Sequence, residues 1–440
     1  MPEIQRNHYL SSKSIGVTGA GISGLAFAIS LHKIWPTISS APPPRVVLYE
    51  RDASAAPPGR EGYSLSLRSD APSAGIQTLQ KMGLIDKFME LAVSNLGSSG
   101  GEGGFTVWDK NWKEVMKMRL KAPPGCPVAG LRVARKDLRC TLVEAVEKLP
   151  HTEIRWDTTV SSVAVVDGNA GQGGKVEVQL SDGKREMHDL LIAADGSSSR
   201  LRTLLRPSDP LTFAGPTLIS GTASMAHHPS GNAAEFGSVI SGEGVSIFIA
   251  PIDSEKLVWA LSWIHPGSEP PVLKKTPLGT QDNEGSKAEA LERGRLFGKR
   301  WEKMVQSTEE SKVTRFNAMD KQAFPHSSTP PYITSSDPAV ASLNVTKQVV
   351  FLGDASHAVS PFAGNGANLA LMDGWDFAAS LVESASLLEA VQKYDKLAVD
   401  RANLVIKTSH STINLMHSKG LWWWFYKCML TVVSWFSFRN

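Results

Sequence analysis

Apolar and polar positions near the N-terminus follow the pattern of a strand, a turn, a helix and a second strand. Residues 15–18 form a short β-rich run, and residues 22–34 carry apolar side chains at helical spacing. A Pro/Ser-rich connector over residues 36–44 leads into a second β-rich run, RVVLYERD, which begins at Arg45. We therefore predict a βαβ unit with a lengthened loop between its helix and its second strand.

The pattern changes along the rest of the chain. Helical periodicity is found over residues 73–91, 134–149 and 375–417. Short alternating runs between residues 154 and 264 predict strands, and residues 266–290 form a polar, Pro-rich insertion. This order predicts an α/β fold in which a strand-rich domain interrupts a Rossmann-type domain, followed by a helical C-terminus.

The first turn contains three glycines at the spacing of a dinucleotide-binding motif. Gly19 allows a tight turn, Gly21 lets the backbone approach a pyrophosphate, and Gly24 allows close packing of helix on strand. The free N–H groups of the helix N-terminus favour phosphate oxygens. Glu50 ends the second strand, where an acidic side chain binds both ribose hydroxyls and disfavours a 2′-phosphate. FAD and NAD therefore remain open, and NADP is not expected at this site.

Two later strands also end in Asp and Gly. LLIAADGSSSRLR, residues 190–202, carries an arginine four residues after its Asp-Gly pair. VVFLGDASHAVSPFAGNGANLAL, residues 349–371, runs from a strand through a loop into an apolar-periodic helix. An NAD enzyme needs neither stretch, whereas the flavin of FAD extends well beyond its pyrophosphate.

These stretches together resemble the signatures of a known enzyme family. GAGISGL with Glu50, ADGSSSRLR, and LGDASHAVSPFAGNGANLAL are similar to the three motifs of the single-component, class A FAD-dependent aromatic hydroxylases, over roughly residues 13–400. ARKDLRCTL resembles the family helix that begins with an arginine. The similarity is strongest to tetracycline-degrading enzymes and to monooxygenases of fungal secondary metabolism.

The resemblance implies how each matching residue would bind FAD. Asp354 would bond the ribityl chain, and Arg135 would reach the ribityl-phosphate region. Asp195 and Gly196 would support FAD and, in the family, NADPH. Arg51 would lie on the adenine, unless it is a solvated surface arginine. A loop that holds the redox end, with a helix N-terminus near the flavin N1–C2=O edge, would comprise Gly353, Pro361, Ala363, Gly364, Asn365 and Gly366.

The resemblance also implies a reaction. In that family NADPH reduces FAD, O₂ adds to form a C4a-hydroperoxide, and one oxygen atom passes to the substrate. We expect an FAD- and NADPH-dependent monooxygenase that acts on a lipophilic, aromatic metabolite of the polyketide or alkaloid kind. The alternatives are an FAD-dependent epoxidase of a prenylated metabolite, a flavin oxidase that does not hydroxylate, and a non-catalytic flavin-binding protein.

Substrate contacts and a general base are harder to place. Aromatic residues of the middle strands are candidates for an apolar wall over the flavin, although such residues more often belong to the core. His326 and His357 are candidates for a base, with a structural role as the alternative for each, so the catalytic residues stay unknown. The wall candidates are Phe213, Phe236, Phe248, Trp259 and Trp263.

Composition limits the cellular compartment and the kinds of binding partner that we expect. Hydrophobic residues make up 42% of 440 residues, the formal net charge is +3, and no basic block indicates nucleic acid. Cys126, Cys140 and Cys428 lie far apart without metal-ligand spacing, so we expect no metal and a reducing compartment. The N-terminus lacks the apolar segment of a secretory signal. We therefore expect an intracellular protein, cytoplasmic or peripherally bound to a membrane.

Residues 421–438, LWWWFYKCMLTVVSWFSF, depart from the pattern of the rest of the chain. Their length is near the lower limit for crossing a bilayer, and their tryptophans favour a membrane–water interface. Three alternatives remain: a helix buried against the body, interfacial contact with a membrane, and a true span.

The predicted elements divide the chain into six segments. Residues 13–85, 131–205 and 346–385 would form the FAD-binding domain, residues 86–130 and 206–345 the substrate domain, and residues 386–440 the C-terminal helices with the apolar tail.

Overall fold

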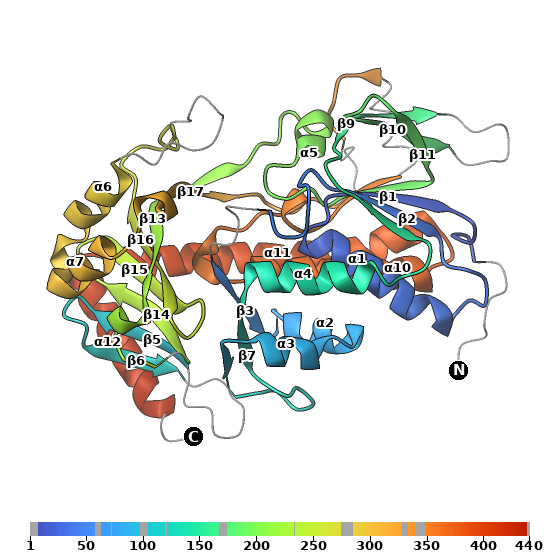
Figure 1. The fold of residues 1–440 in the computed structure, drawn as a ribbon. Coiled ribbons are helices and arrows are strands. Elements are labelled where there is room, and N and C mark those ends of the chain that lie inside the picture. Colours follow the sequence, from blue (N-terminus) through green and yellow to red (C-terminus); the bar gives the residue numbers. More distant parts are fainter. Residues whose placement is uncertain are drawn as a thin grey trace.

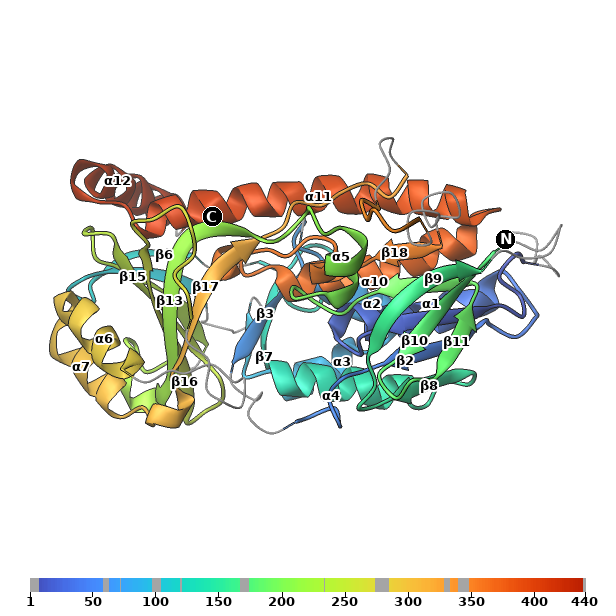
Figure 2. The same ribbon diagram turned by 90° about the horizontal axis from the view of Figure 1, so that it is seen from above.

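Two groups of sheets lie at opposite ends of the molecule, and a long helix runs along both (Figure 1). Seen from above, this helix, α11 (Leu387–Met416), spans almost the whole length of the fold (Figure 2). The computed structural model describes residues 8–57, 63–71, 73–96, 104–118, 121–166, 174–232, 234–273, 285–327, 333–338 and 348–437.

The predicted βαβ unit forms the centre of a parallel sheet. Within the described residues this sheet has the strand order β18-β12-β1-β2-β8, and every pairing in it is parallel. Val46 and Leu48 of β2 pack against the helices, whereas Val47 faces the opposite side. Burial on both faces is typical of parallel sheets. The strands are β1 (Ser14–Thr18), β2 (Arg45–Tyr49), β8 (Thr152–Arg155), β12 (Leu190–Ala193) and β18 (Val349–Phe351), and the packed helices are α1 (Ile22–Ile34), α4 (Arg135–Val146) and α10 (Gly366–Glu383).

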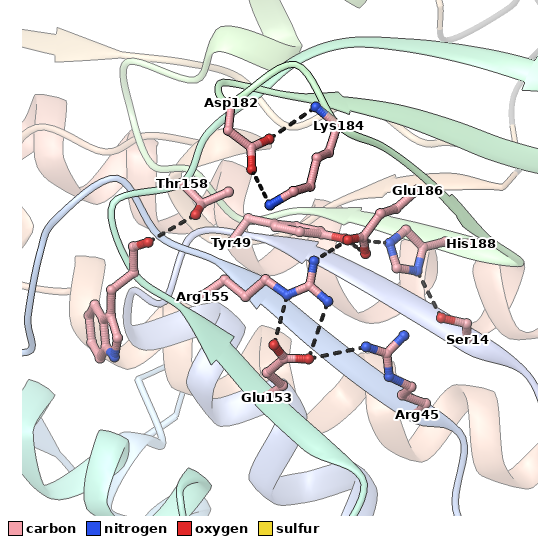
Figure 3. A network of polar contacts seen from close by, with 11 residues as sticks. Ser14, Arg45, Tyr49, Glu153, Arg155, Thr158, Asp182, Lys184, Glu186 and His188 are labelled. Atoms are coloured by element: carbon pink, nitrogen blue, oxygen red, sulfur yellow. Dashed lines mark hydrogen bonds and ion pairs between the residues drawn. The ribbon is translucent and has the colours of Figure 1, made fainter.

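A small antiparallel sheet covers the other face of the parallel sheet. Figure 3 shows the polar contacts that join the two. Tyr49 donates its hydroxyl proton to Glu186 at 2.8 Å and lies 2.7 Å from Nε2 of His188, whose Nδ1 lies 2.9 Å from the Ser14 hydroxyl. Burial lowers the pKa of His188 to about 4, so its ring is neutral and serves as a structural link. The small sheet comprises β9 (Val160–Val166), β10 (Lys175–Leu180) and β11 (Arg185–His188).

The strand-rich part of the chain forms a long mixed sheet at the other end of the molecule. Its order within the described residues is β17-β13-β16-β15-β14-β5-β6, and α6 (Ser286–Arg293) and α7 (Gly298–Gln306) cover its outer face (Figure 1). The strands are β5 (Gly104–Asp109), β6 (Glu114–Met118), β13 (Thr212–Ser224), β14 (Glu235–Ile240), β15 (Val245–Pro251), β16 (Lys256–Ile264) and β17 (Thr314–Asp320).

A short linking sheet stands between the parallel sheet and the long sheet. It comprises β3 (Ser64–Arg68), β7 (Gly130–Ala134) and β4 (Ser94–Leu96), with β7 in the middle. Helix α5 (Arg200–Leu205) follows β12. The α/β fold and the helical C-terminus are confirmed, while the six-segment division stays a proposal.

Two predicted helices are each interrupted. The helix predicted over residues 73–91 breaks at Gly83, whose φ of +79° ends α2 (Gly75–Met82) before α3 (Ile85–Leu91) begins. The helical stretch predicted over residues 375–417 breaks after Glu383, because the Ser386 side chain caps the start of α11 by accepting from the Glu389 N–H.

The apolar C-terminal segment forms α12 (Gly420–Ser437), which packs against β6 along one side only. Leu430 and Ser434 are buried there, and the Lys427 ammonium lies 2.9 Å from Asp109. Trp422 and Trp424 are 69% and 65% exposed on the other side. Across the described residues, no helix has the length and hydropathy needed to cross a bilayer.

Candidate functional site: a dinucleotide cradle built from both ends of the chain

The glycine-rich turn follows directly from the end of β1. Gly19 has a φ of +96°, and its N–H donates to the Tyr49 carbonyl at 2.8 Å. A Cβ at this position would lie 2.5 Å from the Ala194 carbonyl oxygen, so only glycine fits between the ends of β1 and β12. At Gly21, in contrast, the nearest described atom would be 3.9 Å from a Cβ. The turn is therefore tight against the protein on one side and open on the other.

Glu50 holds this turn in place. Its two carboxylate oxygens accept from the N–H groups of Ala20 at 2.8 Å and Asp52 at 2.9 Å. The Arg139 guanidinium lies 3.2 Å from the Glu50 carboxylate and 2.7 Å from the Asp52 carboxylate. Its Nε–H donates to the Ala20 carbonyl. A carboxylate oxygen has room for a second donor, so Glu50 can still accept from a ribose hydroxyl. The role of Arg139 was missed by sequence reasoning, although it lies one helical turn after Arg135.

The second glycine-containing loop lies against the first. Gly353 follows β18 with a φ of +58°, and a Cβ there would lie 2.9 Å from the hydroxyl of Ser23, near the start of α1. Farther along, where α10 packs on α1, the ring centres of Phe27 and Phe377 lie 5.8 Å apart with the rings tilted by 32°. Segments more than 300 residues apart in sequence thus meet at the carboxyl end of the parallel sheet, where ligands bind in α/β folds.

Asp354 presents a carboxylate without a donor. Its backbone carbonyl accepts from Arg202, but within the described ranges no group donates a hydrogen bond to its side chain. Burial raises the pKa of this carboxyl, while the positive charges of Arg202 and Arg135 lower it. A half-buried carboxylate to which no described group donates fits the hydroxyls of a sugar or ribityl chain.

Arg135 lies beside the same carboxylate. It begins α4, donates its backbone N–H to the Tyr63 carbonyl at 3.0 Å, and places its guanidinium 5.9 Å from the centre of the Tyr63 ring. Burial and Asp354 raise the pKa of Tyr63, and Arg135 lowers it. Tyr63, which sequence reasoning missed, therefore forms a cluster with Arg135 and Asp354.

The loop before α10 is open on its outer side. Pro361 and Ala363 lie in a 3-10 turn, and a Cβ at Gly364 or Gly366 would meet no described atom within 4 Å. The side chain of Asn365 is fixed by the protein, because the Ser73 hydroxyl donates to its Oδ1 at 2.7 Å. There is therefore room for a ligand beside the first turn of α10, and the free N–H groups of a helix start suit a partly negative ring edge.

The Asp-Gly pair after β12 has a different local role. The Asp195 carboxylate accepts from the Ser199 hydroxyl at 2.5 Å and from the Arg200 N–H at 2.8 Å, and so caps α5. Gly196 adopts a φ of +82° beside it. Arg202, rather than the arginine four residues after Gly196, joins this loop to the end of β18, by donating to the carbonyls of Asp354 and Ala355 at 3.2 and 3.0 Å.

Arg51 is exposed, which is compatible both with a place on the adenine and with a solvated surface arginine.

A buried cluster of charged side chains supports the loop that begins at Gly353. Asp373 of α10 is fully buried and accepts from the Gly353 N–H at 2.9 Å. It also pairs with His357 at 2.6 Å and with Arg401 at 2.9 Å. Burial opposes the charge on His357, but Asp373 raises its pKa above the ordinary value. His326 is buried too, and pairs with Asp395 at 2.8 Å. Both histidines therefore fit the structural alternative better than that of a general base.

Strand register corrects the proposed aromatic wall. Ser238 pairs with Phe248 and Phe248 pairs with Ala260, so Phe236 and Phe248 share one face of the long sheet. Trp259 lies on the opposite face, where its ring contacts Trp301 of α7 at 5.0 Å. Trp263 belongs to the same buried cluster. These two tryptophans cannot line a site on the face that the linking sheet covers, and Phe213 lies beside His265 near the start of β13.

The parallel sheet, the glycine-rich turn and the second loop define a dinucleotide-binding oxidoreductase fold whose cradle fits FAD. The family model described as an FAD binding domain matches residues 297–408. Monooxygenase cfoF from Aspergillus candidus is 33% identical over 424 residues, which cover 94% of this chain and 94% of that protein. The chain therefore belongs to the class A FAD-dependent monooxygenases.

Solved structures agree at the level of the fold. Klebsiella pneumoniae HpxO complexed with FAD and uric acid matches with a TM-score of 0.70 at 18% identity, covering 96% of this chain and 93% of that chain. Tetracycline destructase Tet(55) matches with a TM-score of 0.67 at 17% identity, covering 97% of each chain. The Rossmann-type FAD-binding domain interrupted by a strand-rich domain is thereby confirmed.

Proposed function

We propose that this FAD-dependent monooxygenase uses NADPH and O₂ to place one oxygen atom on a lipophilic, aromatic metabolite. The observation that carries the proposal is the meeting of the Gly19–Gly24 turn with the Gly353–Gly366 loop around open space at one edge of the parallel sheet. Bound FAD would supply the redox chemistry, accepting electrons from NADPH and activating O₂, whose second oxygen atom leaves as water. The C4a route expected from the resemblance stays a prediction.

The chain's own groups would then divide the work of binding. Gly21 and the start of α1 would receive the pyrophosphate, and Glu50 the adenosine ribose. Asp354 would accept from the ribityl hydroxyls, with Arg135 near the ribityl phosphate. The start of α10 would stabilise negative charge on the reduced ring through its N–H groups. Each role rests on the geometry of the loops and on the family motifs.

The face of the long sheet that lies toward the linking sheet supports the proposal of a lipophilic, aromatic substrate. Phe236 contacts the rings of Phe105 and Phe248 at 5.5 and 6.5 Å, and all three belong to one apolar cluster with Ala250 and Val258. An aromatic surface of this kind favours a flat, lipophilic compound.

The proposal is tested by the anaerobic rate at which NADPH bleaches the visible absorption of the bound flavin, with and without candidate phenolic or prenylated metabolites. We expect at least one aromatic compound to accelerate bleaching, because the flavin of a substrate-gated hydroxylase is reduced faster once substrate is bound. An equal rate with every compound would instead indicate an oxidase or an enzyme whose flavin reduction is not gated by substrate. No bleaching under any condition would exclude NADPH as the electron donor.

We also propose that α12 contacts a membrane surface. One side of this helix packs on β6, and its other side exposes Leu421, Trp422, Phe425 and Val432. Exposed Trp and Phe on an apolar helix that carries one lysine and no acidic residue favour contact with a membrane–water interface. Such contact would place the site near lipid-dissolved substrates.

The double variant Trp422→Ser/Phe425→Ser should weaken binding to phosphatidylcholine vesicles about tenfold or more, because two large apolar side chains no longer enter the interface. Vesicle co-sedimentation of the full-length protein measures this. Val272→Ser, at a residue that is 94% exposed outside α12, should leave binding unchanged. If the wild-type protein stays in the supernatant, the membrane proposal is wrong.

A further inference from the structure

Arg132 is a buried arginine in the middle strand of the linking sheet. Its neighbours Leu131 and Val133 point into the apolar core beside the helices. Because side chains alternate along a strand, Arg132 points to the opposite face, toward the long sheet. There its guanidinium lies 5.2 Å from the centre of the Phe236 ring, and only 2% of the residue is exposed.

No acidic group of the described residues accompanies this cation. Among the described residues, Arg132 takes part in no ion pair, and burial alone accounts for the lowering of its pKa to about 9. Its neighbours are neutral oxygens: the Ser66 hydroxyl at 2.6 Å, the Ser64 carbonyl at 3.1 Å and the Ser64 hydroxyl. Its Nε–H is buried without an acceptor within the described part of the chain. The guanidinium stays protonated at neutral pH and is only partly satisfied.

The position of Arg132 connects it to the proposed substrate region. Ser66, which binds the guanidinium, accepts at its backbone carbonyl from the side-chain amide of Asn368 at 2.9 Å. Asn368 lies two residues after the Gly-Asn-Gly turn that leads into α10. Ser64 donates to the Pro251 carbonyl at 2.6 Å, at the end of β15 in the long sheet. Arg132 therefore stands between the loop proposed to hold the flavin ring and the aromatic face formed by Phe236 and Phe248.

A buried, unpaired charge is costly to a fold, and a protein that only needed packing would place an apolar residue at this point. Such a departure from the rules of a stable core is expected at functional sites. A planar guanidinium with an unused N–H is suited to an oxyanion, because charge-assisted hydrogen bonds to carboxylates and phenolates are stronger than neutral ones.

We propose that Arg132 binds an anionic oxygen of the substrate, either a carboxylate or an ionised phenol or enol, while the substrate ring lies against Phe236 and Phe248. This inference rests on the proposed function for the location of the substrate. It specifies in addition that the substrate is anionic and that Arg132 selects for this charge. Ser64 and Ser66 orient the guanidinium from behind and leave its remaining N–H groups to the ligand.

The test uses the FAD-loaded, full-length protein and two pairs of probes matched in shape. 2-Naphthoate is compared with 2-naphthamide, and pentafluorophenolate with pentafluoroanisole, by titration of the flavin difference spectrum. In the wild-type protein we expect at least one anion to bind more tightly than its neutral partner. The pair that shows the preference separates a carboxylate from a phenolate ligand.

Arg132→Met should weaken anion binding about 10- to 100-fold and leave neutral probes unchanged, because a charge-assisted interaction is lost while the apolar contacts remain. Its urea midpoint should equal or exceed that of the wild type, since an uncompensated buried charge is removed. Arg132→Lys should keep part of the anion preference. Arg185→Met, which removes an exposed arginine of β11, should change neither quantity.

Equal affinity of wild type and Arg132→Met for the anions would overturn the proposal, as would a wild type that shows no anion preference. A lower urea midpoint with parallel loss of neutral and anionic probes would show that Arg132 serves only the scaffold. None of these titrations uses NADPH or O₂. Failure of the proposed function in the bleaching experiment is therefore distinguishable from failure of the anion site.

Discussion

Gly21→Val should yield a folded, colourless protein. The residue has φ −86° and ψ −174°, which any side chain can adopt, and a Cβ would meet only the Ala194 carbonyl oxygen, at 3.9 Å. The fold should therefore tolerate the change. The valine side chain would fill the space through which the backbone approaches the FAD pyrophosphate. Since each lost charge-assisted hydrogen bond weakens binding about 10- to 100-fold, we expect FAD affinity to fall at least 100-fold.

FAD content after desalting measures the predicted loss of cofactor, and the far-ultraviolet circular dichroism spectrum measures the predicted retention of the fold. Gly174→Val provides the control, because a Cβ at Gly174 would make only ordinary contacts, at 3.5 Å or more, beside the small sheet. That variant should stay yellow. Retention of FAD by Gly21→Val at wild-type affinity would remove the glycine-rich turn from the binding site.

The second large effect is expected for Asp373→Asn. The wild-type carboxylate is fully buried and accepts at once from Gly353, His357 and Arg401. Loss of its charge leaves the cation of Arg401 without its buried partner, which typically costs about 3–5 kcal/mol in the free energy of unfolding. Because Gly353 also loses its anchor, we expect weaker FAD binding. Urea unfolding followed by tryptophan fluorescence measures the first effect and flavin titration the second.

Asp376→Asn is the matched control, since Asp376 also binds Arg401, at 2.7 Å, but is partly open to solvent. Burial raises the pKa of Asp376, so the folded protein gains less from its charge, and we expect a loss of about 1 kcal/mol or less. Equal destabilisation by the two substitutions would contradict a central role for Asp373.

The stabilisation by Asp373 should depend on pH with a definite sign. Burial raises its pKa, but His357 and Arg401 outweigh this and lower it to about 2. A carboxylate with a depressed pKa stabilises the fold above its unfolded pKa of about 3.9, and this stabilisation is lost as the pH falls toward 2. The difference in unfolding free energy between wild type and Asp373→Asn should therefore shrink across this window. A constant difference would indicate that charge is not its origin.

Much of the cradle could be predicted from sequence because its motifs are local. The glycine spacing, the acidic end of β2 and the loop before α10 are each contained in a short stretch. The supporting residues are not local in this sense. Arg139 reaches Glu50 and Asp52 from another element, and Asp373 bonds Gly353 across 20 residues. For Asp373 a signal was available, because it is a charged residue in the mostly apolar helix α10. For Arg139 there was none, because α4 carries several charged residues.

The tryptophans of β16 show a different limit. Period-two alternation predicts that Trp259 and Trp263 share a face, but it does not tell which face lies toward the flavin. Only the pairing of Phe248 with Ala260 and of Ile249 with Trp259 decides this. The same alternation placed Arg132 opposite Leu131 and Val133, so the lone charge in GLRVA was a readable signal that sequence reasoning did not use.

The meeting of Gly353 with Ser23 has a consequence for biosynthesis. A ribosome releases the first βαβ unit long before it makes β18 and α10, so the nascent N-terminal part has no complete pocket to which the cofactor can bind. With the site proposed above, flavin would gain its full set of contacts, and so its full stabilising effect, only after translation has passed the start of α10 at Gly366. Earlier folding would then draw on the protein's own contacts, and the supply of cofactor would affect mainly chains that are nearly finished.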